Sequence, residues 1–170
     1  MSNFHENGII ILDFGSQYTQ LIARRIREQH VYSEIMSPDV SIEVVQERSP
    51  KAIILSGGPS SVYEDSSQEY DSKLFAMDIP ILGICYGLQL MAHHYNGHVE
   101  SSSHGEYGFA LINIMNSEHL FQSVSGNTQV WMSHMDRVTQ MPPGWEIMAE
   151  SSNGVVAAMG HMESKRFETH

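Results

Sequence analysis

The sequence predicts an α/β protein of three layers, in which helices cover both faces of an open, mostly parallel β-sheet. Three short apolar runs, unbroken by polar residues, are typical of buried parallel strands: Ile9–Leu12, Ala52–Leu55 and residues 79–84. Segments with helical periodicity separate these runs, and parallel strands need such crossovers. After Gly97, strand-like segments are separated by turn residues, which predicts antiparallel additions to the same sheet.

The first half of the chain is expected to alternate between strand and helix. An amphipathic helix follows the first apolar run, because Tyr18, Leu21 and Ile22 repeat at helical spacing while the neighbouring arginines fall largely on the other side. The remaining expected elements are a strand at residues 31–36, helices at 42–47 and 69–77, and later strands at 107–115, 129–132, 146–150 and 155–159.

Length and composition suit one compact domain. The chain has 170 residues, of which 41% are hydrophobic, enough for a single core spanning residues 1–170. The polar connectors are too short to act as linkers between domains, and the sequence contains no internal repeat. We therefore expect one domain.

Charge and cysteine content limit the partners and the compartment. Nine Lys and Arg against 20 Asp and Glu give a formal net charge of -11, which disfavours nucleic acid and anionic membrane surfaces as partners. The apolar runs are far shorter than the roughly 20 residues that cross a bilayer. A single cysteine cannot form an internal disulfide, and the N-terminal residues lack the pattern of a signal peptide. We therefore expect a cytoplasmic protein.

The motif Gly83-Ile84-Cys85-Tyr86-Gly87 stands where a buried strand is expected to end and a helix to begin. It is the cysteine version of a nucleophile elbow, a turn so sharp that the nucleophile takes a strained conformation while the glycines provide space. The amino terminus of the following helix favours thiolate and would lower the thiol pKa from its usual value of about 8.5. The alternative is a buried core cysteine, the usual fate of a lone cysteine in a cytosolic domain.

A second glycine motif, residues 56–59 with Gly57 and Gly58 at its centre, follows another buried strand. In a parallel sheet it would lie at the same carboxyl edge as Cys85, where open α/β proteins place their sites. If they point at a carbonyl group under attack, the backbone N–H groups of Gly58 and Tyr86 would form an oxyanion hole. The alternative for this motif is a plain turn between a strand and a helix.

Four stretches of the sequence together resemble the class I, or triad-type, glutamine amidotransferases. The second and third of them occur across that class, whereas the first is most similar to the glutaminase domains of GMP synthetases. The resemblance covers the chain from about Gly8 to Phe167. The stretches are residues 11–21, 55–59, 83–89 and 130–136.

This resemblance implies hydrolysis of L-glutamine to glutamate and ammonia. Cys85 would attack the side-chain amide, the N–H groups of Gly58 and Tyr86 would hold the oxyanion, and the γ-glutamyl thioester would then be hydrolysed. No metal is implied. The other family positions are substrate-binding Gln89, Ser133 and His134, with Gly57, Gly83, Gly87 and Asp136 as support for the motifs and their loops.

In the family, the ammonia passes to a synthetase domain, normally on the same chain. That domain uses ATP and Mg to activate XMP and aminates it to GMP in purine nucleotide biosynthesis. The sequence contains neither this domain nor a phosphate-binding glycine-lysine motif, so no cofactor is expected in the glutaminase domain itself. A homodimer is expected to form through the missing part.

The sequence departs from the family pattern at two functional places. Met135 replaces the glycine of the usual Ser-His-Gly-Asp loop, and it would be strained if that position needs a positive φ. The family's Phe-His-Pro-Glu segment, which supplies a general base and its orienting glutamate, is not found, so the domain is expected to be incomplete at its C-terminal end and poorly active. We assign the base to none of His134, His161 and His170.

Three alternative functions stay open at this point. The chain could be the glutaminase of another synthase, such as those of anthranilate or carbamoyl phosphate, although residues 11–21 argue against it. It could be a non-catalytic binding domain that has lost the triad, although such a domain has no need of a strained cysteine turn. A flavodoxin-like protease or chaperone is disfavoured because it has no use for Ser133 and His134.

Overall fold

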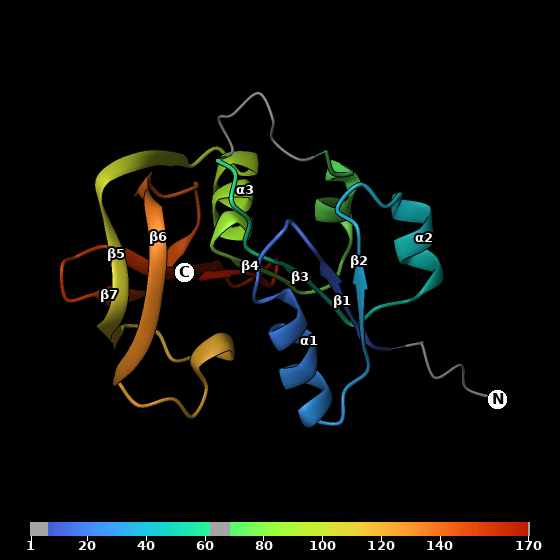
Figure 1. Ribbon diagram of the computed structural model, residues 1–170, viewed down its shortest axis with the longest axis horizontal. Coiled ribbons are helices and arrows are strands. Elements are labelled where there is room, and N and C mark those ends of the chain that lie inside the picture. Colours follow the sequence, from blue (N-terminus) through green and yellow to red (C-terminus); the bar gives the residue numbers. More distant parts are fainter. Residues whose placement is uncertain (1–6, 62–68, 170) are drawn as a thin grey trace.

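The computed structural model describes residues 7–61 and 69–169, with the side chains of residues 102–106, 134, 135 and 168 outside the description (Figure 1). In this part of the chain, no helix is both long and apolar enough to span a bilayer. The elements in chain order are β1 Ile9–Leu12, α1 Thr19–Glu28, β2 Ser33–Met36, α2 Ile42–Glu47, β3 Ala52–Leu55, a 3₁₀ helix Ser72–Ala76, β4 Ile81–Ile84, α3 Tyr86–His94, β5 His98–Ile114, a second 3₁₀ helix His119–Phe121, β6 Asn127–Gln140, β7 Glu146–Ser151, β8 Val156–His161 and β9 Arg166–Thr169.

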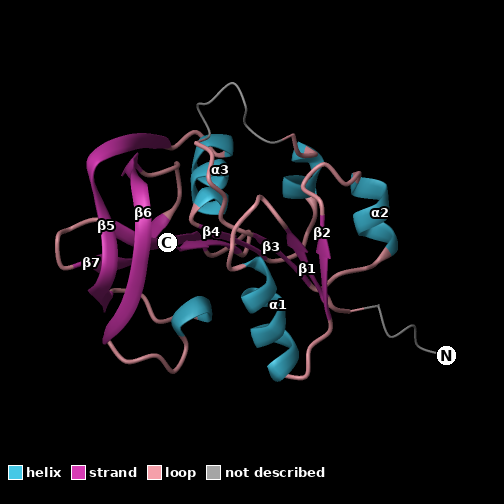
Figure 2. Cartoon of the chain, viewed as in Figure 1, coloured by secondary structure: helices cyan, strands magenta, loops and turns pink. Residues whose placement is uncertain are grey.

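The described strands form one nine-stranded sheet in the order β2-β1-β3-β4-β9-β8-β7-β5-β6. The pairs from β2 to β9 are parallel, and the pairs from β9 to β6 are antiparallel. Helices lie on both faces of the parallel part (Figure 2). The expected mostly parallel α/β fold with antiparallel additions is confirmed, but the strand β9 that joins the two parts was not anticipated.

Alternate residues of the parallel strands face different helices. Along β1, Ile10 and Leu12 belong to the large core that contains residues of α2, α3 and the first 3₁₀ helix. Ile11 instead packs with Ala23 of α1 on the other face. The unbroken apolar runs are therefore explained by burial on both sides of the sheet.

The expectation of a helix over residues 69–77 is wrong, because the helical part is only the 3₁₀ turn Ser72–Ala76. The carboxylate of Asp71 accepts the Lys73 N–H at 3.0 Å and the Ile42 N–H, at the start of α2, at 3.2 Å. Asp71 has extended backbone and begins the turn as its cap, so the helix cannot extend toward residue 69.

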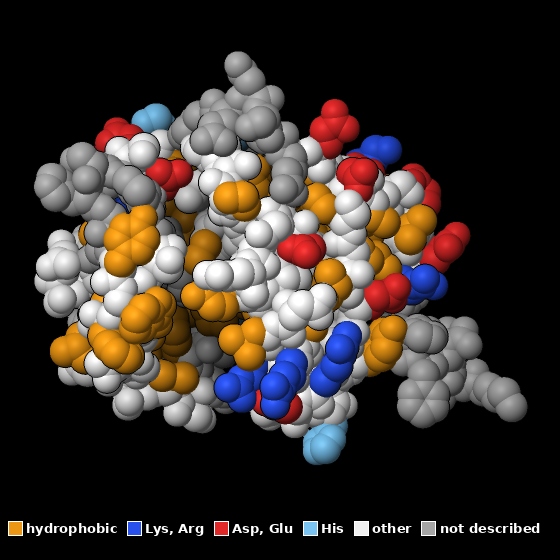
Figure 3. All heavy atoms as spheres, in the orientation of Figure 1, with side chains coloured by type: hydrophobic (Ala, Val, Ile, Leu, Met, Phe, Trp, Pro, Cys, Tyr) orange, Lys and Arg blue, Asp and Glu red, His pale blue; other side chains and the backbone are white. Residues whose placement is uncertain are grey.

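The outer face of strands β5 and β6 exposes large apolar side chains (Figure 3). Phe109 and Trp131 are paired across the two strands and contact edge to face, with ring centroids 4.9 Å apart. They are 73% and 59% exposed, and Tyr107 on the same face is 64% exposed. Tyr107 also lines a hollow beside Cys85, so this apolar face adjoins the carboxyl edge of the parallel strands.

Arg166, the first residue of β9, is buried and connects three parts of the fold. Its guanidinium donates to the carbonyl oxygens of Phe75 at 3.1 Å and of Ile79, in the segment that leads into β4. It also donates to the Tyr95 hydroxyl at 3.1 Å, just after α3. Because a planar guanidinium carries five donors, one side chain can satisfy several carbonyl groups that would otherwise be buried without partners.

We expect the substitution Arg166→Met to lower the free energy of unfolding by about 3 kcal/mol or more, since each buried acceptor left without a donor costs about 1–3 kcal/mol. Urea unfolding followed by circular dichroism measures the change. The control is Arg25→Met on α1, whose side chain is 72% exposed; its effect should stay within about 0.5 kcal/mol. Equal effects of the two substitutions would show that Arg166 does not anchor β9.

Candidate active site

Cys85 is the single residue between β4 and α3, and its backbone is strained. Its φ is 52° and its ψ is -106°, a conformation that residues with a side chain rarely adopt. The Cys85 N–H donates to the Thr169 carbonyl of β9 at 2.9 Å, and the Cys85 carbonyl accepts the Gln89 N–H of α3 at 3.1 Å. The strained turn expected from the sequence is therefore present.

The glycines on either side of Cys85 are required by close backbone contacts. A Cβ atom on Gly83 would lie 2.5 Å from the Gly87 carbonyl oxygen, and one on Gly87 would lie 2.4 Å from the Leu55 carbonyl oxygen. No Cβ atom tolerates such distances to backbone. The first turn of α3 is therefore packed directly against β3 and β4, as expected for this motif.

The second glycine motif lies against the elbow. A Cβ atom on Gly57 would be 3.3 Å from the Cys85 Cβ, and one on Gly58 would be 2.3 Å from the Phe14 carbonyl oxygen. Cys85 is half-buried rather than enclosed in the core. The arrangement that would exclude a catalytic role, a sulfur buried far from Gly57 and Gly58, is therefore not found.

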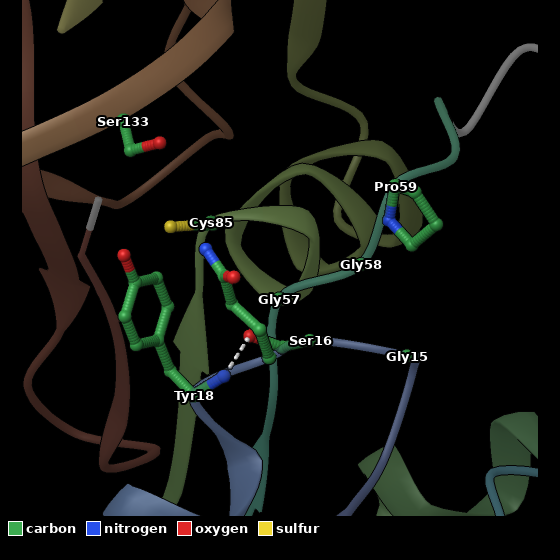
Figure 4. A pocket seen from close by; sticks show the side chains of 9 residues that line it. Gly15, Ser16, Tyr18, Gly57, Gly58, Pro59, Cys85 and Ser133 are labelled. Carbon is green, nitrogen blue, oxygen red and sulfur yellow. Dashed lines mark hydrogen bonds between the residues drawn. The ribbon is translucent and has the colours of Figure 1, made fainter.

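Two neighbouring hollows share Cys85 in their walls. One has a volume of about 370 Å³ and the other of about 300 Å³, and both are also lined by Gly58, Pro59 and Ser133. Figure 4 shows the smaller hollow, into which the Cys85 sulfur and the Ser133 hydroxyl point from opposite walls. A small molecule in either hollow would touch the thiol.

The larger hollow brings together most of the residues singled out in the sequence. Gln89 and Asp136 are only 7% and 9% exposed, yet both line this hollow. Among the described residues, the Gln89 side-chain oxygen has no hydrogen-bond partner although it is buried. Such an acceptor is costly to leave unpaired, which suits it to a ligand with N–H groups. The predicted residues in this wall are Gly58, Cys85, Tyr86, Gln89, Ser133 and Asp136.

The loop expected around Ser133 and Asp136 is a strand. Strand β6 continues through these residues, and Ser133 pairs with Tyr107 of β5 while Asp136 pairs with Ser101. The irregularity lies on β5, where the register shifts between Ser101 and Glu106. The side chains of His134 and Met135 lie outside the described residues. The sequence-based expectation of a loop is wrong because pairing with β5 extends the strand beyond its apolar part.

Burial raises the pKa of the Cys85 thiol above its ordinary value. This finding corrects the expectation that the amino terminus of α3 would lower it. Half-burial removes water from the sulfur, and desolvation disfavours the charged thiolate. The thiol is therefore the resting form at neutral pH, and a base has to remove its proton before it can act as a nucleophile.

His161 lies away from these hollows. Its Nδ1 is 2.8 Å from the Ser164 hydroxyl, and with Trp145 it lines a separate hollow of about 260 Å³. No group of three or more His, Cys, Asp or Glu side chains suited to a metal occurs within residues 7–61 and 69–169. Because His161 lines a different hollow, it is not in position to accept the proton of Cys85.

Sequence reasoning missed two contributions to the site. Tyr107 and Ser101 of β5 line the larger hollow, and the Thr169 carbonyl of β9 holds the Cys85 backbone. Tyr107 carried only a weak signal, as an aromatic residue at the start of an expected strand. Thr169 gave no such signal, because β9 has only four residues, two of them charged, and does not have the apolar pattern of a strand.

The chain is similar in sequence to proteins of one family. The sequence profile of the Glutamine amidotransferase class-I family matches residues 10–169. The GMP synthase (glutamine-hydrolyzing) of Campylobacter lari is 50% identical over 159 residues, which make up 94% of this chain and 31% of the relative. The enzyme of the same name from Ligilactobacillus salivarius is 51% identical over 161 residues with the same coverage. The chain thus spans about a third of the length of the curated relatives it matches.

Two solved structures share the fold. A candidate GMP synthase component from Thermoplasma acidophilum has a TM-score of 0.84 and 27% identity, over 97% of this chain and 83% of that one. A glutamine amidotransferase from Thermotoga maritima has a TM-score of 0.73 and 18% identity, over 97% of this chain and 74% of that one. With the strained cysteine turn and the profile match over residues 10–169, the chain belongs to the class I glutamine amidotransferase family.

Proposed function

We propose that this domain hydrolyses L-glutamine to glutamate and ammonia through a thioester on Cys85. The observation that carries this proposal is the strained Cys85 thiol in the wall of a hollow that Gly58, Tyr86 and Gln89 also line. Hydrolysis of an amide by this route requires a nucleophile and donors for the oxyanion, and the buried acceptor of Gln89 suits an N–H group of the substrate. The names of the relatives that are about half identical support the same substrate.

In the proposed reaction, the Cys85 thiol loses its proton and the sulfur attacks the side-chain amide carbon of glutamine. The carbonyl oxygen becomes an oxyanion, which accepts hydrogen bonds from the backbone N–H groups of Gly58 and Tyr86. Tyr86 is the first residue of α3, where N–H groups point out of the helix end. The proton returns to the amide nitrogen, ammonia leaves, and water then hydrolyses the thioester to glutamate.

The glutamine is proposed to bind through Gln89, Ser133, His134 and Asp136. The unpaired side-chain oxygen of Gln89 suits an N–H donor such as the α-ammonium group of the substrate. The carboxyl group of Asp136 in the same wall would add a favourable charge for that ammonium group. Ser133 faces Cys85 across the hollow and can bond the amide or the carboxylate end.

The ammonia is proposed to pass to a synthetase domain that uses ATP and Mg to aminate XMP to GMP. The name of the relatives, GMP synthase, and their threefold greater length support this partner. The same names favour GMP synthesis over the glutaminase of another synthase. We propose that the glutaminase domain itself needs no cofactor and works in the cytoplasm, and that the whole enzyme is a homodimer.

The base for Cys85 is proposed from chain connectivity. The Thr169 carbonyl accepts the Cys85 N–H at 2.9 Å, so β9 ends beside the nucleophile. The next residue along the chain is His170, which lies outside the described residues. Histidine is the usual general base, because its unperturbed pKa of about 6.5 suits proton transfer near neutral pH. Although the sequence alone assigned the base to no histidine, we therefore propose His170, which directly follows Thr169 in the chain, for this role.

We expect 6-diazo-5-oxo-norleucine, a reactive glutamine mimic, to alkylate Cys85 with loss of N₂. Intact-mass and peptide mass spectrometry would locate the adduct. Excess L-glutamine should slow the labelling, and Cys85→Ser should abolish it. A folded domain that stays unlabelled, or that releases no ammonia from glutamine, would favour the non-catalytic binding domain instead.

The substitution His170→Ala is expected to lower the rate of ammonia release from glutamine by about 10²-fold or more, the usual contribution of a general base. A coupled glutamate dehydrogenase assay measures the rate. His161→Ala is the matched control and should leave it unchanged, because His161 lines a different hollow. A His170→Ala rate equal to that of the unaltered protein would place the base elsewhere.

Alkylation of Cys85 by iodoacetamide should still be accelerating above pH 8.5, where an ordinary thiol is half ionised. The thiolate is the reactive form, and a raised pKa shifts its appearance to higher pH. The chain has one cysteine, so mass spectrometry reports this thiol alone. If the rate reaches half of its maximum at a lower pH than for free cysteine, the α3 amino terminus lowers the thiol pKa by more than burial raises it.

A further inference from the structure

Ser56 follows β3 directly and has no part in the reaction proposed above. It is fully buried, with 0% of its surface exposed. Its hydroxyl accepts the Phe14 N–H at 2.9 Å and lies 2.9 Å from the Gly57 carbonyl oxygen, to which it donates. Its own N–H donates to the Leu12 carbonyl at 3.0 Å. The hydroxyl thus donates its one hydrogen bond to the backbone carbonyl of Gly57, which is next to Cys85.

The orientation of that carbonyl decides where the next N–H points. The Gly57 carbonyl and the Gly58 N–H belong to one peptide group, and no cis peptide bond occurs among the described residues. In a planar trans peptide the C=O and N–H bonds point in opposite directions. Because Ser56 holds the Gly57 oxygen in the buried interior, the Gly58 N–H points the opposite way, and Gly58 lines both hollows.

The peptide group between Gly57 and Gly58 is the part of this glycine motif that can rotate most easily. Two glycines in succession have no side chain to oppose a rotation of the peptide between them. A Cβ atom on Gly58 would lie 2.3 Å from the Phe14 carbonyl oxygen, and one on Gly57 would lie 3.3 Å from the Cys85 Cβ, so there is no room for a side chain at Gly58 and little at Gly57. A hydrogen bond is therefore the direct means of selecting one of its orientations.

The hydrogen bonds of Ser56 also make the Gly58 N–H a stronger donor. The Phe14 N–H donates to the Ser56 hydroxyl, which donates to the Gly57 carbonyl, and this carbonyl shares one peptide group with the Gly58 N–H. Each bond in such a chain polarises the next, and the effect is largest away from water. The last member is the N–H that would face the developing oxyanion.

We infer that Ser56 is a positioning residue, which fixes and polarises the Gly57–Gly58 peptide so that the Gly58 N–H is held as an oxyanion donor. This inference rests on the proposed glutamine hydrolysis. Although Ser56 lies outside both hollows, it is expected to affect the transition state and to have little effect on the binding of glutamine.

The test compares Ser56→Ala with the unaltered protein in ammonia release from glutamine. We expect kcat to fall about 10- to 100-fold, part of the roughly 10²–10³-fold that loss of an oxyanion donor costs in well-studied hydrolases. KM should stay within about threefold, because the oxyanion exists only in the transition state and intermediate. The rate of Cys85 alkylation by iodoacetamide should not change, since that displacement builds no oxyanion.

Ser33→Ala is the matched control. Ser33 is 1% exposed, and its hydroxyl also bonds a backbone carbonyl, that of Ala23 at 3.1 Å, but it lies at the start of the edge strand β2. The Ser33→Ala variant should lose about as much stability as Ser56→Ala and should keep the kcat of the unaltered protein. A fall in kcat of the same size in both variants would overturn the inference.

Ser56→Thr separates the hydroxyl from the packing. It keeps the hydroxyl but adds a methyl group, so its kcat, measured per folded molecule, should exceed that of Ser56→Ala. The inference is overturned if the alanine variant matches the unaltered protein, if its alkylation rate falls together with kcat, or if the threonine variant is the slower of the two. An unaltered protein that releases no ammonia would instead refute the proposed function itself.

Discussion

The site depends on the close backbone contact between the start of α3 and strands β3 and β4. Gly83 and Gly87 approach each other, and Gly87 approaches Leu55, to distances at which neither position can carry a Cβ atom. With the helix so close to the strands, one residue has to make the whole turn between them. Cys85 takes the strain as a positive φ, and its side chain consequently projects toward the carboxyl edge of the sheet.

Strand β9 is the second requirement, because it joins the parallel and antiparallel parts of the sheet beside Cys85. At its start Arg166 bonds carbonyl groups before β4, and at its end Thr169 bonds the N–H of Cys85. The same strand pairs with β8 in the opposite sense. The hollow is bounded on one side by the parallel strand ends and on the other by β5 and β6, and β9, β8 and β7 lie between β4 and β5 in the sheet.

The sequence allowed prediction of the parallel half and the elbow, because unbroken apolar runs and paired glycines reflect local constraints. The bounds of β1, β3 and α2 match those expected. The rest depends on distant contacts. Strand β9 has Arg166 and Glu168 among its four residues, and its strand character comes from partners elsewhere in the chain. The polar ends of β5 and β6 become strand only by pairing with each other, and the direction of the Cys85 pKa shift depends on burial.

Burial raises the pKa of the Cys85 thiol, so the thiol is protonated in the absence of a base. A thiol that stays protonated at rest resists oxidation and stray alkylation, since both need the thiolate. Attack on an amide then requires two things at once: a base to take the proton and donors to receive the charge on the oxygen. In the proposed reaction, the strained turn and the adjoining glycine motif would supply these donors from the backbone, whose position needs no bound ligand. The ionisation of Cys85 is therefore the step that a base and a bound substrate would control.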